Sequence, residues 1–334
     1  MKDNNNISGT DWISIVKKYN FPDPIKSWWQ LGSNLLLYAL GWYLMYLSLS
    51  VSYWITLALT LPSAGILVRL FIIFHDCGHG TFFRSGKLRE ITGRFIGILT
   101  FTPYNSWICM HQLHHETAGN LDHRGLGDVW TLTAEEYLNS TPWQRIVYRF
   151  YRNPVTMFGI GTLFVFLVGN RFTNKKMDSK GRLGVWITNA GLLLFAAGMT
   201  LLIGFKAFVL IQLPLIYVAA IMGFWLFYVQ HQFNPTYWSH DENWDYKSVG
   251  LRGSSYYKLP AILHWFTGNI GYHHIHHLGP MIPNYKLRRC QRENELFQTV
   301  PPLTFLGSFK TLALRLWDEQ NGEMISLRKL KSRR

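Results

Sequence analysis

Two long apolar stretches constrain the fold of this chain more than any other feature of its sequence. Residues 31–74 contain one charged side chain, Arg69, and residues 183–230 contain only Lys206. A membrane-spanning helix needs roughly 20 apolar residues, and each stretch is more than twice that length. We therefore expect two helical hairpins. The predicted spans are about residues 31–50, 51–74, 183–203 and 207–230, with tight turns near 48–53 and 203–207.

The composition also favours a membrane protein over a soluble one. Only 16% of the 334 residues are charged, whereas about 25% is usual in a soluble domain. We expect one all-α polytopic membrane domain over residues 1–334, with four transmembrane helices, interfacial helices and a cytoplasmic cap. Two weaker apolar segments, 91–110 and 155–170, are predicted to be interfacial or re-entrant. If either segment crossed the membrane alone, the histidine clusters described below would lie on opposite sides.

The charge balance predicts the orientation of the chain. Lys and Arg number 33 against 19 acidic residues, which gives a net charge of +14. In a membrane protein such an excess marks the cytoplasmic face, and the loop 171–182 is especially basic. We expect this loop, both termini and the active site on the cytoplasmic side of the plasma membrane. A nucleic-acid partner is not expected, because no zinc finger, recognition helix or RNA-binding motif is present.

Histidine is concentrated in three short strings. HDCGH covers residues 75–79, HQLHH covers 111–115 and HHIHH covers 273–277. On a helix, positions i, i+3 and i+4 share one face, so each string presents two or three imidazoles together. A single string of this kind also occurs as a helix cap or a headgroup contact, but three with the same spacing indicate metal ligands. The side chains that share faces are His75 and His79; His111, His114 and His115; and His273, His276 and His277.

The number and type of these ligands narrow the choice of metal. Eight imidazoles are too many for one tetrahedral zinc, which takes four ligands. The three cysteines, Cys77, Cys109 and Cys290, are too few and too scattered for an iron–sulfur cluster. The Glu-x-x-His pairs of soluble di-iron bundles do not appear either. A pair of irons held by histidines fits best, because zinc has no redox chemistry.

The histidine strings and their surroundings resemble those of the membrane fatty acid desaturases. The similarity is strongest to the acyl-lipid desaturases of Gram-positive bacteria, and it extends over most of the chain. The resemblance implies four transmembrane helices and a cytoplasmic cap that holds a di-iron site. The matching strings are FHDCGHGTFF, NLDHRGLGDVWTLT, FYVQH, DENW, GSSYYKLP, TGNIGYHHIHHL and IPNYKL.

The resemblance also assigns roles to individual residues. It implies that the eight histidines named above ligate the irons, and that His231, at the end of the fourth predicted span, is a ninth ligand. No catalytic residue is expected beyond the metal ligands. A ligating imidazole usually donates its other N–H to a carboxylate. Four acidic residues near the strings are candidates for this role: Asp76, Asp122, Asp128 and Asp241.

The activity that the resemblance implies is an oxygen-dependent desaturation. Two irons would use dioxygen to introduce a cis double bond, of the delta-5 or delta-12 type, into the acyl chains of membrane phospholipids. The sequence shows no haem-binding His-Pro-Gly-Gly motif and no Gly-rich nucleotide fingerprint. We therefore expect electrons from a separate reduced ferredoxin or flavodoxin, whose acidity would suit a basic protein.

Three other functions are compatible with the same residues. A membrane di-iron hydroxylase or ketolase would carry the same histidine strings but leave oxygen on its product. A metal transporter would place its ligands near the middle of the bilayer, whereas these strings lie beyond the ends of the spans. A structural lipid-binding protein would hold no iron. Product and metal analysis separate these alternatives.

Overall fold

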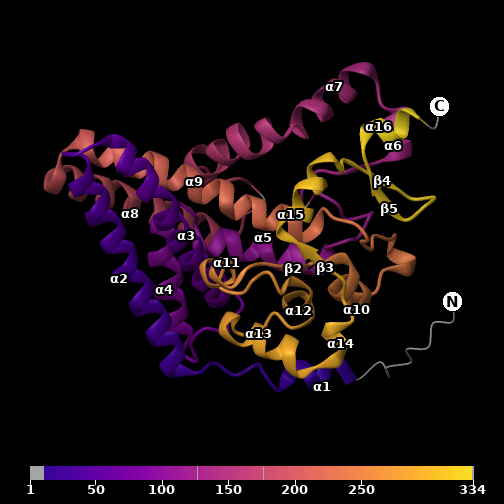
Figure 1. Ribbon diagram of the computed structural model, residues 1–334, viewed down its shortest axis with the longest axis horizontal. Coiled ribbons are helices and arrows are strands. Elements are labelled where there is room, and N and C mark those ends of the chain that lie inside the picture. Colours follow the sequence, from indigo (N-terminus) through magenta and orange to yellow (C-terminus); the bar gives the residue numbers. More distant parts are fainter. Residues whose placement is uncertain (1–10, 126, 176, 333–334) are drawn as a thin grey trace.

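The computed structural model describes residues 11–125, 127–175 and 177–332, and it is mostly helical. Four long helices form the part at the left of Figure 1, and shorter helices with a few strands form the part at the right. The long helices are α2 (Pro24–Ser48), α3 (Tyr53–Gly78), α8 (Ser179–Ile203) and α9 (Phe205–His231).

Two pairs of consecutive long helices lie where the sequence predicts the two hairpins, with turns near the expected positions. Helix α2 ends at Ser48 and α3 begins at Tyr53, while Gly204 alone separates α8 from α9. Gly204 has a φ of 85°, a left-handed conformation that glycine adopts without steric cost. Asp178 begins α8 by accepting a hydrogen bond from the Gly181 N–H at 2.7 Å, which satisfies a free donor of the first turn.

Helix α3 lies at the centre of the long helices, and α8 lies at their periphery. In α3, 61% of the apolar core segment is buried, whereas in α8 the value is 6%. Leu193, Leu194 and Leu201 of α8 are accordingly exposed. Large apolar side chains in such numbers on an outer helix fit contact with lipid rather than with water.

The set of helices able to span a membrane differs in one member from the prediction. Among the described residues, α3, α8 and α9 are long and apolar enough, and a bent pair formed by Pro142–Tyr151 and Val155–Arg171 adds a fourth if it is counted as one span. Helix α2 has 25 residues but is not in this set. Its Trp and Tyr residues, together with Asn34, make it less apolar than the other three.

The segment 91–110 is not one helix but belongs to two. Its first part lies in helix α4 (Gly86–Leu99), and its last part lies in α5 (Tyr104–Thr117) after a break. At the break Phe101 has a φ of 57°, and its carbonyl accepts hydrogen bonds from Asn170 Nδ2 at 3.1 Å and from Arg171 at 2.6 Å. The basic side chain of Arg171 is therefore engaged within the protein.

The segment 155–170 is helical but irregular. It forms wide π-helical turns at η1 (Val155–Gly161) and η2 (Phe164–Val168), followed by η3 (Gly169–Arg171). Together these turns make an angle of 65° with the preceding helix α7 (Pro142–Tyr151). Figure 1 shows α7 rising away from the long helices toward the upper right.

The remaining elements form the cap. A three-stranded sheet has the order β1-β4-β5, with β1 parallel to β4 and β5 antiparallel to it, and β2 pairs in parallel with β3. The strands are β1 (Leu132–Thr133), β2 (Tyr256–Lys258), β3 (Pro302–Thr304), β4 (Leu316–Asp318) and β5 (Glu323–Ile325). The helices are α1 (Asp11–Lys17), α6 (Ala134–Asn139), η4 (Asp241–Asn243), α10 (Tyr246–Ser248), η5 (Val249–Gly253), α11 (Ala261–Phe266), α12 (His273–Leu278), α13 (Asn284–Glu293), α14 (Glu295–Gln298), α15 (Phe305–Ser308), η6 (Phe309–Ala313) and α16 (Leu327–Lys331).

Candidate metal centre

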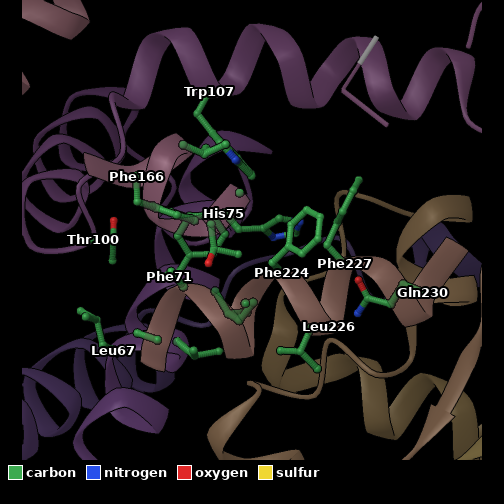
Figure 2. A pocket seen from close by; sticks show the side chains of 18 of the residues that line it. Leu67, Phe71, His75, Thr100, Trp107, Phe166, Phe224, Leu226, Phe227 and Gln230 are labelled. Carbon is green, nitrogen blue, oxygen red and sulfur yellow. The ribbon is translucent and has the colours of Figure 1, made fainter. Parts of the chain in front are cut away.

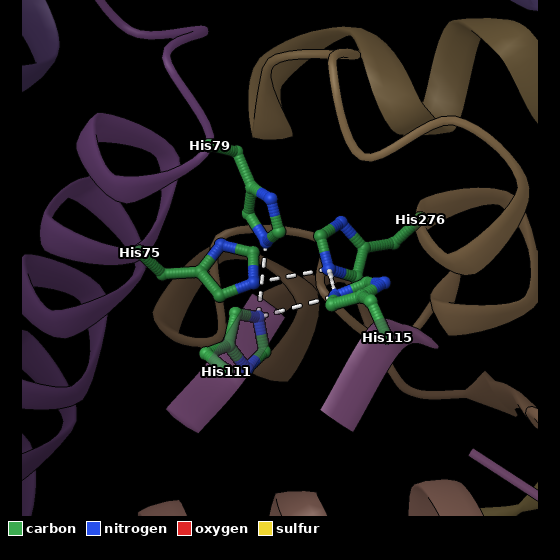
Figure 3. Close-up of side chains that lie close together, drawn as sticks. All are labelled: His75, His79, His111, His115 and His276. Atoms are coloured by element: carbon green, nitrogen blue, oxygen red, sulfur yellow. Dashed lines mark hydrogen bonds between the residues drawn. The ribbon is translucent and has the colours of Figure 1, made fainter. Parts of the chain in front are cut away.

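The structure brings nine histidines from four separate segments into two groups. Within each group the possible ligand nitrogens all lie within 4.8 Å of one another, and Figure 3 shows the first group. The two groups together contain every histidine that the sequence nominated as a ligand. The first group consists of His75, His79, His111, His115 and His276, and the second of His114, His231, His273 and His277.

Helix periodicity explains how single segments serve both groups. In α5, His111 and His115 belong to the first group, while His114 belongs to the second. An α-helix turns about 100° per residue, so positions i and i+4 point together and i+3 points slightly to one side. Helix α12 shows the reverse division, with His273 and His277 in the second group and His276 in the first. Each helix therefore lies between the two groups.

The imidazoles of each group meet through their Nε2 atoms. In the first group the Nε2–Nε2 distances are 3.0 Å for His75–His276, 3.0 Å for His79–His111, 3.2 Å for His111–His115 and 3.0 Å for His115–His276. In the second group they are 3.1 Å for His114–His231, 3.0 Å for His231–His273 and 3.1 Å for His273–His277.

This donor set fits a transition-metal ion in each group. A neutral imidazole has one N–H and one lone pair, so several Nε2 atoms directed at one another cannot all be satisfied by mutual hydrogen bonds. A cation among them accepts every lone pair at once. Imidazole nitrogen is a ligand of intermediate softness that suits iron, copper, nickel and zinc.

Burial keeps these side chains in the form that binds metal. Loss of hydration lowers the pKa of His111, His115 and His276 well below the usual value, and neighbouring imidazoles lower it further. The same causes lower the pKa of His273 and His277. Desolvation disfavours the charged imidazolium, so these rings are neutral near pH 7, as metal ligation requires.

Two of the four nominated carboxylates contact the histidine groups. Asp76 Oδ1 lies 3.2 Å from His75 Nδ1, and Asp128 Oδ1 lies 2.5 Å from His114 Nδ1. In each case a carboxylate that accepts the Nδ1–H leaves Nε2 with its lone pair free. Asp76 is also held in place, because the backbone and side-chain amides of Asn284 donate to its Oδ2.

The other two carboxylates, Asp122 and Asp241, bond elsewhere. Asp122 Oδ1 lies 2.7 Å from Nδ1 of His240, and Asp241 Oδ1 lies 3.3 Å from Nε2 of His123. Both histidines are about half exposed and belong to neither group. Closeness in sequence to a histidine string was therefore not sufficient to identify a carboxylate that contacts a ligand. The loop that follows α5 places Asp122 beside His240 instead.

Two supporting residues were not nominated from the sequence. Asn284 positions Asp76, as described above. Arg152 is 2% exposed, and it donates hydrogen bonds to Gln232 Oε1 at 2.8 Å and to the Leu314 carbonyl at 2.9 Å. Gln232 directly follows His231, so Arg152 joins the end of α7 to the second group. No motif in the sequence distinguishes these two residues from ordinary polar ones.

The second histidine of HHIHH, His274, is buried but lies outside both groups. Its Nε2 is 2.9 Å from Gln291 Oε1. His264 is also buried, and its ring stacks on Tyr272. Neither side chain belongs to the two groups of possible metal ligands.

An apolar cavity of about 390 Å³ adjoins the histidine groups. Helices α3 and α9 form two of its walls, and the irregular turns η1 and η2 form another. Figure 2 shows Leu67, Phe71, Phe224 and His75 among its lining side chains. His111 and His273 also line it, so the cavity reaches both groups. Such a space can hold an extended apolar chain and present it to metal ions.

Comparisons with known proteins agree with this geometry. Residues 52–302 match a sequence model of the family described as "Fatty acid desaturase". A protein of Bacillus subtilis named "Fatty acid desaturase" is 47% identical over 290 residues, which cover 87% of this chain and 82% of that protein.

More distant relatives have more specific names. The "sn-1 oleoyl-lipid 12-desaturase" of Picosynechococcus is 25% identical over 285 residues, covering 80% of this chain and 76% of that protein. The "sn-1 acyl-lipid omega-3 desaturase (ferredoxin)" of Synechocystis is 27% identical over 235 residues, covering 66% of this chain and 62% of that protein.

Proposed function

The chain belongs to the fatty acid desaturase family, and from this premise we propose that it introduces a cis double bond into the acyl chains of membrane lipids with a di-iron centre held by nine histidines. It is an oxidoreductase of the acyl-lipid desaturase type. The observation that carries the proposal is the junction of two histidine groups with a long apolar cavity. The delta-5 and delta-12 positions remain the two expected classes of product.

The chemistry and the protein contribute different parts of the reaction. Bound irons would supply the oxidising power that removes two hydrogens from adjacent methylenes, with dioxygen taking two electrons from the substrate and two from a donor to form two waters. The nine imidazoles would hold the metal ions. Asp76 and Asp128 set the tautomers of His75 and His114. The cavity excludes water and aligns the acyl chain. Because the chain has no polar group near the reacting carbons, only apolar contacts with the cavity wall can position it.

Membrane phospholipid is the substrate that best suits this arrangement. The turns η1 and η2, which form one wall of the cavity, also carry apolar side chains on the outer surface of the protein. Val155, Ile160 and Phe164 are exposed there. Val165 lines the cavity and is itself 48% exposed, so the cavity wall is continuous with the lipid-facing surface. The names of the relatives in Picosynechococcus and Synechocystis point to acyl lipids as well.

A reduced ferredoxin or flavodoxin is the proposed electron donor. The Synechocystis relative carries ferredoxin in its name, and the net charge of +14 favours an acidic partner. Within the basic loop 171–182, Lys175 and Lys180 are exposed, whereas Arg171 is engaged with Phe101 and Asn189. Lys176 lies outside the described residues. The exposed lysines are therefore the better candidates for contact with a donor.

The histidine groups also bear on topology. Helices α8 and α9 lie between the second and third histidine strings, and two crossings return the chain to its starting side. A third complete crossing by α7 with η1–η3 would separate strings that share one group. We therefore propose that this bent pair enters or lies along the membrane without crossing it. The proposed orientation places the histidine groups on the cytoplasmic side of the plasma membrane, with both termini there if α2 spans.

Cysteine labelling tests this orientation. We expect Lys175→Cys to react with a membrane-impermeant maleimide only after the cells are opened, because its loop precedes α8 on the cytoplasmic side. Ser50→Cys, in the α2–α3 turn, is the matched control and should react in intact cells. Both positions are exposed. Cys109, the exposed native cysteine, is first replaced by serine. Reaction of Lys175→Cys from outside intact cells would overturn the proposed orientation.

The activity is tested by expression in a bacterial host that lacks desaturases. We expect new cis double bonds at one position in the acyl chains of phospholipids, located by mass spectrometry. With purified protein and reduced ferredoxin or flavodoxin, phospholipid vesicles should be desaturated and acyl-coenzyme A should not. Hydroxylated or keto products would instead support the hydroxylase or ketolase alternative. An unchanged lipid profile, with iron movement across the membrane, would support a transporter.

A further inference from the structure

The cavity follows the direction of α3 and α9 for much of their length. On α3 its lining runs from Leu67 to His75, and on α9 it runs from Ile216 to Gln230. At a rise of about 1.5 Å per residue, Leu67 lies about 12 Å along the helix from His75. One end of the cavity therefore lies at the histidine groups, and the other lies deep among the membrane-spanning helices.

This shape determines which way an acyl chain enters it. The polar headgroup of a lipid must stay near water, because burying polar groups among apolar helices without hydrogen-bond partners is energetically unfavourable. The deep end, near Leu67 and Ile216, is therefore suited to the methyl end of the chain. The carbons that react lie at the other end, beside His75 and His273.

The side chains of the α9 wall change in size along the cavity. Near the histidine end the α9 wall carries the bulky Phe224 and Phe227, as the α3 wall carries Phe71, whereas deeper in the cavity the α9 wall has the small Ala219, Ala220 and Gly223. Gly223 lies about 10 Å along α9 from Gln230, which marks the histidine end, and about the same distance from Ile216. It therefore lies about midway along the cavity.

Gly223 is also a wall position with open space beside its backbone. A Cβ atom built on Gly223 meets no other group within 4 Å. By contrast, a Cβ on Gly161, in the opposite wall, would lie 3.1 Å from the Thr156 carbonyl oxygen. Because Gly223 also lines the cavity, we expect bulk added there to enter the cavity without displacing the surrounding protein.

We infer that Gly223 is a specificity-determining residue, which sets how much of the acyl chain extends past the reacting carbons toward its methyl end. The inference rests on the proposed function, since it assigns the cavity to the acyl chain. A larger side chain at Gly223 divides the cavity and leaves room for a shorter methyl-end segment. The enzyme should then prefer shorter chains, or place the double bond nearer the methyl end of a chain of given length.

The test compares Gly223→Ala and Gly223→Leu with the wild-type enzyme in a host fed saturated fatty acids of several lengths. One additional methylene in an apolar pocket commonly changes discrimination by roughly 10–200-fold. For Gly223→Leu we expect at least about a tenfold fall in the ratio of long-chain to short-chain products, with a smaller fall for Gly223→Ala. Alanine and leucine are better helix formers than glycine, so both variants should keep α9 intact.

The matched control is Gly198→Leu in α8, an exposed position whose Cβ also meets nothing within 4 Å. It adds the same bulk to a neighbouring spanning helix but outside the cavity, and it should leave the product pattern unchanged. An identical pattern in wild type, Gly223→Leu and Gly198→Leu would overturn the inference.

A second measurement separates this inference from the proposed activity. The lengths of the acyl chains that purified protein retains from a defined lipid mixture can be measured by mass spectrometry without turnover. Gly223→Leu should retain shorter chains than wild type or Gly198→Leu. Shorter retained chains without any double bonds in the host would support the role of Gly223 while refuting desaturation. Equal retention by all three proteins would refute the role of Gly223 even in an active enzyme.

Discussion

Replacement of His276 or His114 by alanine is expected to abolish desaturation while leaving the protein inserted in the membrane. Each change removes one nitrogen from a different group, since His276 belongs to the first and His114 to the second. The rings contact their neighbours through Nε2, at 3.0 Å from His115 and 3.1 Å from His231 respectively. Loss of one ligand should empty its site, because the remaining imidazoles no longer surround the ion.

The expected loss of activity exceeds the roughly 10–100-fold that is usual when only a supporting residue around a metal is changed. Iron analysis should give about two ions per chain for the wild type and about one for either variant. His274→Asn is the matched control, because His274 lies in the same HHIHH string but bonds to Gln291 rather than to either group. Full activity of His276→Ala or His114→Ala, or equal iron loss in His274→Asn, would contradict the proposed site.

Asp128→Asn is expected to lower iron affinity or activity by roughly 10–100-fold without removing a ligand. Asp128 Oδ1 lies 2.5 Å from His114 Nδ1, where a carboxylate holds the Nδ1–H and directs the Nε2 lone pair toward the second group. Asparagine has nearly the same shape but no charge, and its amide can present N–H to the ring. The ring would then turn or change tautomer more easily.

Titration of the purified apoprotein with ferrous ion measures this effect directly. Asp122→Asn provides the control, because Asp122 also follows the second histidine string in sequence but bonds to His240. We expect weaker binding of about one of the two irons in Asp128→Asn and unchanged binding in Asp122→Asn. Equal iron affinity in the two variants would show that the Asp128–His114 contact does not tune the metal.

Local patterns in the sequence were sufficient to predict the two helical hairpins and the ligand candidates. The apolar stretches located the two hairpins and both turns, because the length of a spanning helix is set by the thickness of the bilayer. The spacing of His111, His114 and His115 indicated shared faces, because helix geometry relates residues three and four apart. Both patterns involve residues that are close together in the chain, so they can be recognised from the sequence alone.

The identity of the supporting carboxylates could not be predicted in the same way. Asp122 and Asp128 both follow the second histidine string, yet only Asp128 contacts a histidine of the groups. The path of the loop between them decides the outcome, and that path depends on contacts with distant segments. Asn284 reaches Asp76 across more than 200 residues, and no local pattern signals such a pair.

What the sequence determined by itself was therefore the two helical hairpins, the candidate histidines and the family, since each follows from short-range patterns or from matching residues. Only the tertiary structure divided the nine histidines between two groups, because His114 and His276 depart from their neighbours according to how α5 and α12 pack against α3 and α9. The cavity, and with it the position of Gly223, has the same origin. A space between helices is a property of their packing, and residues far apart in the chain must meet before it exists.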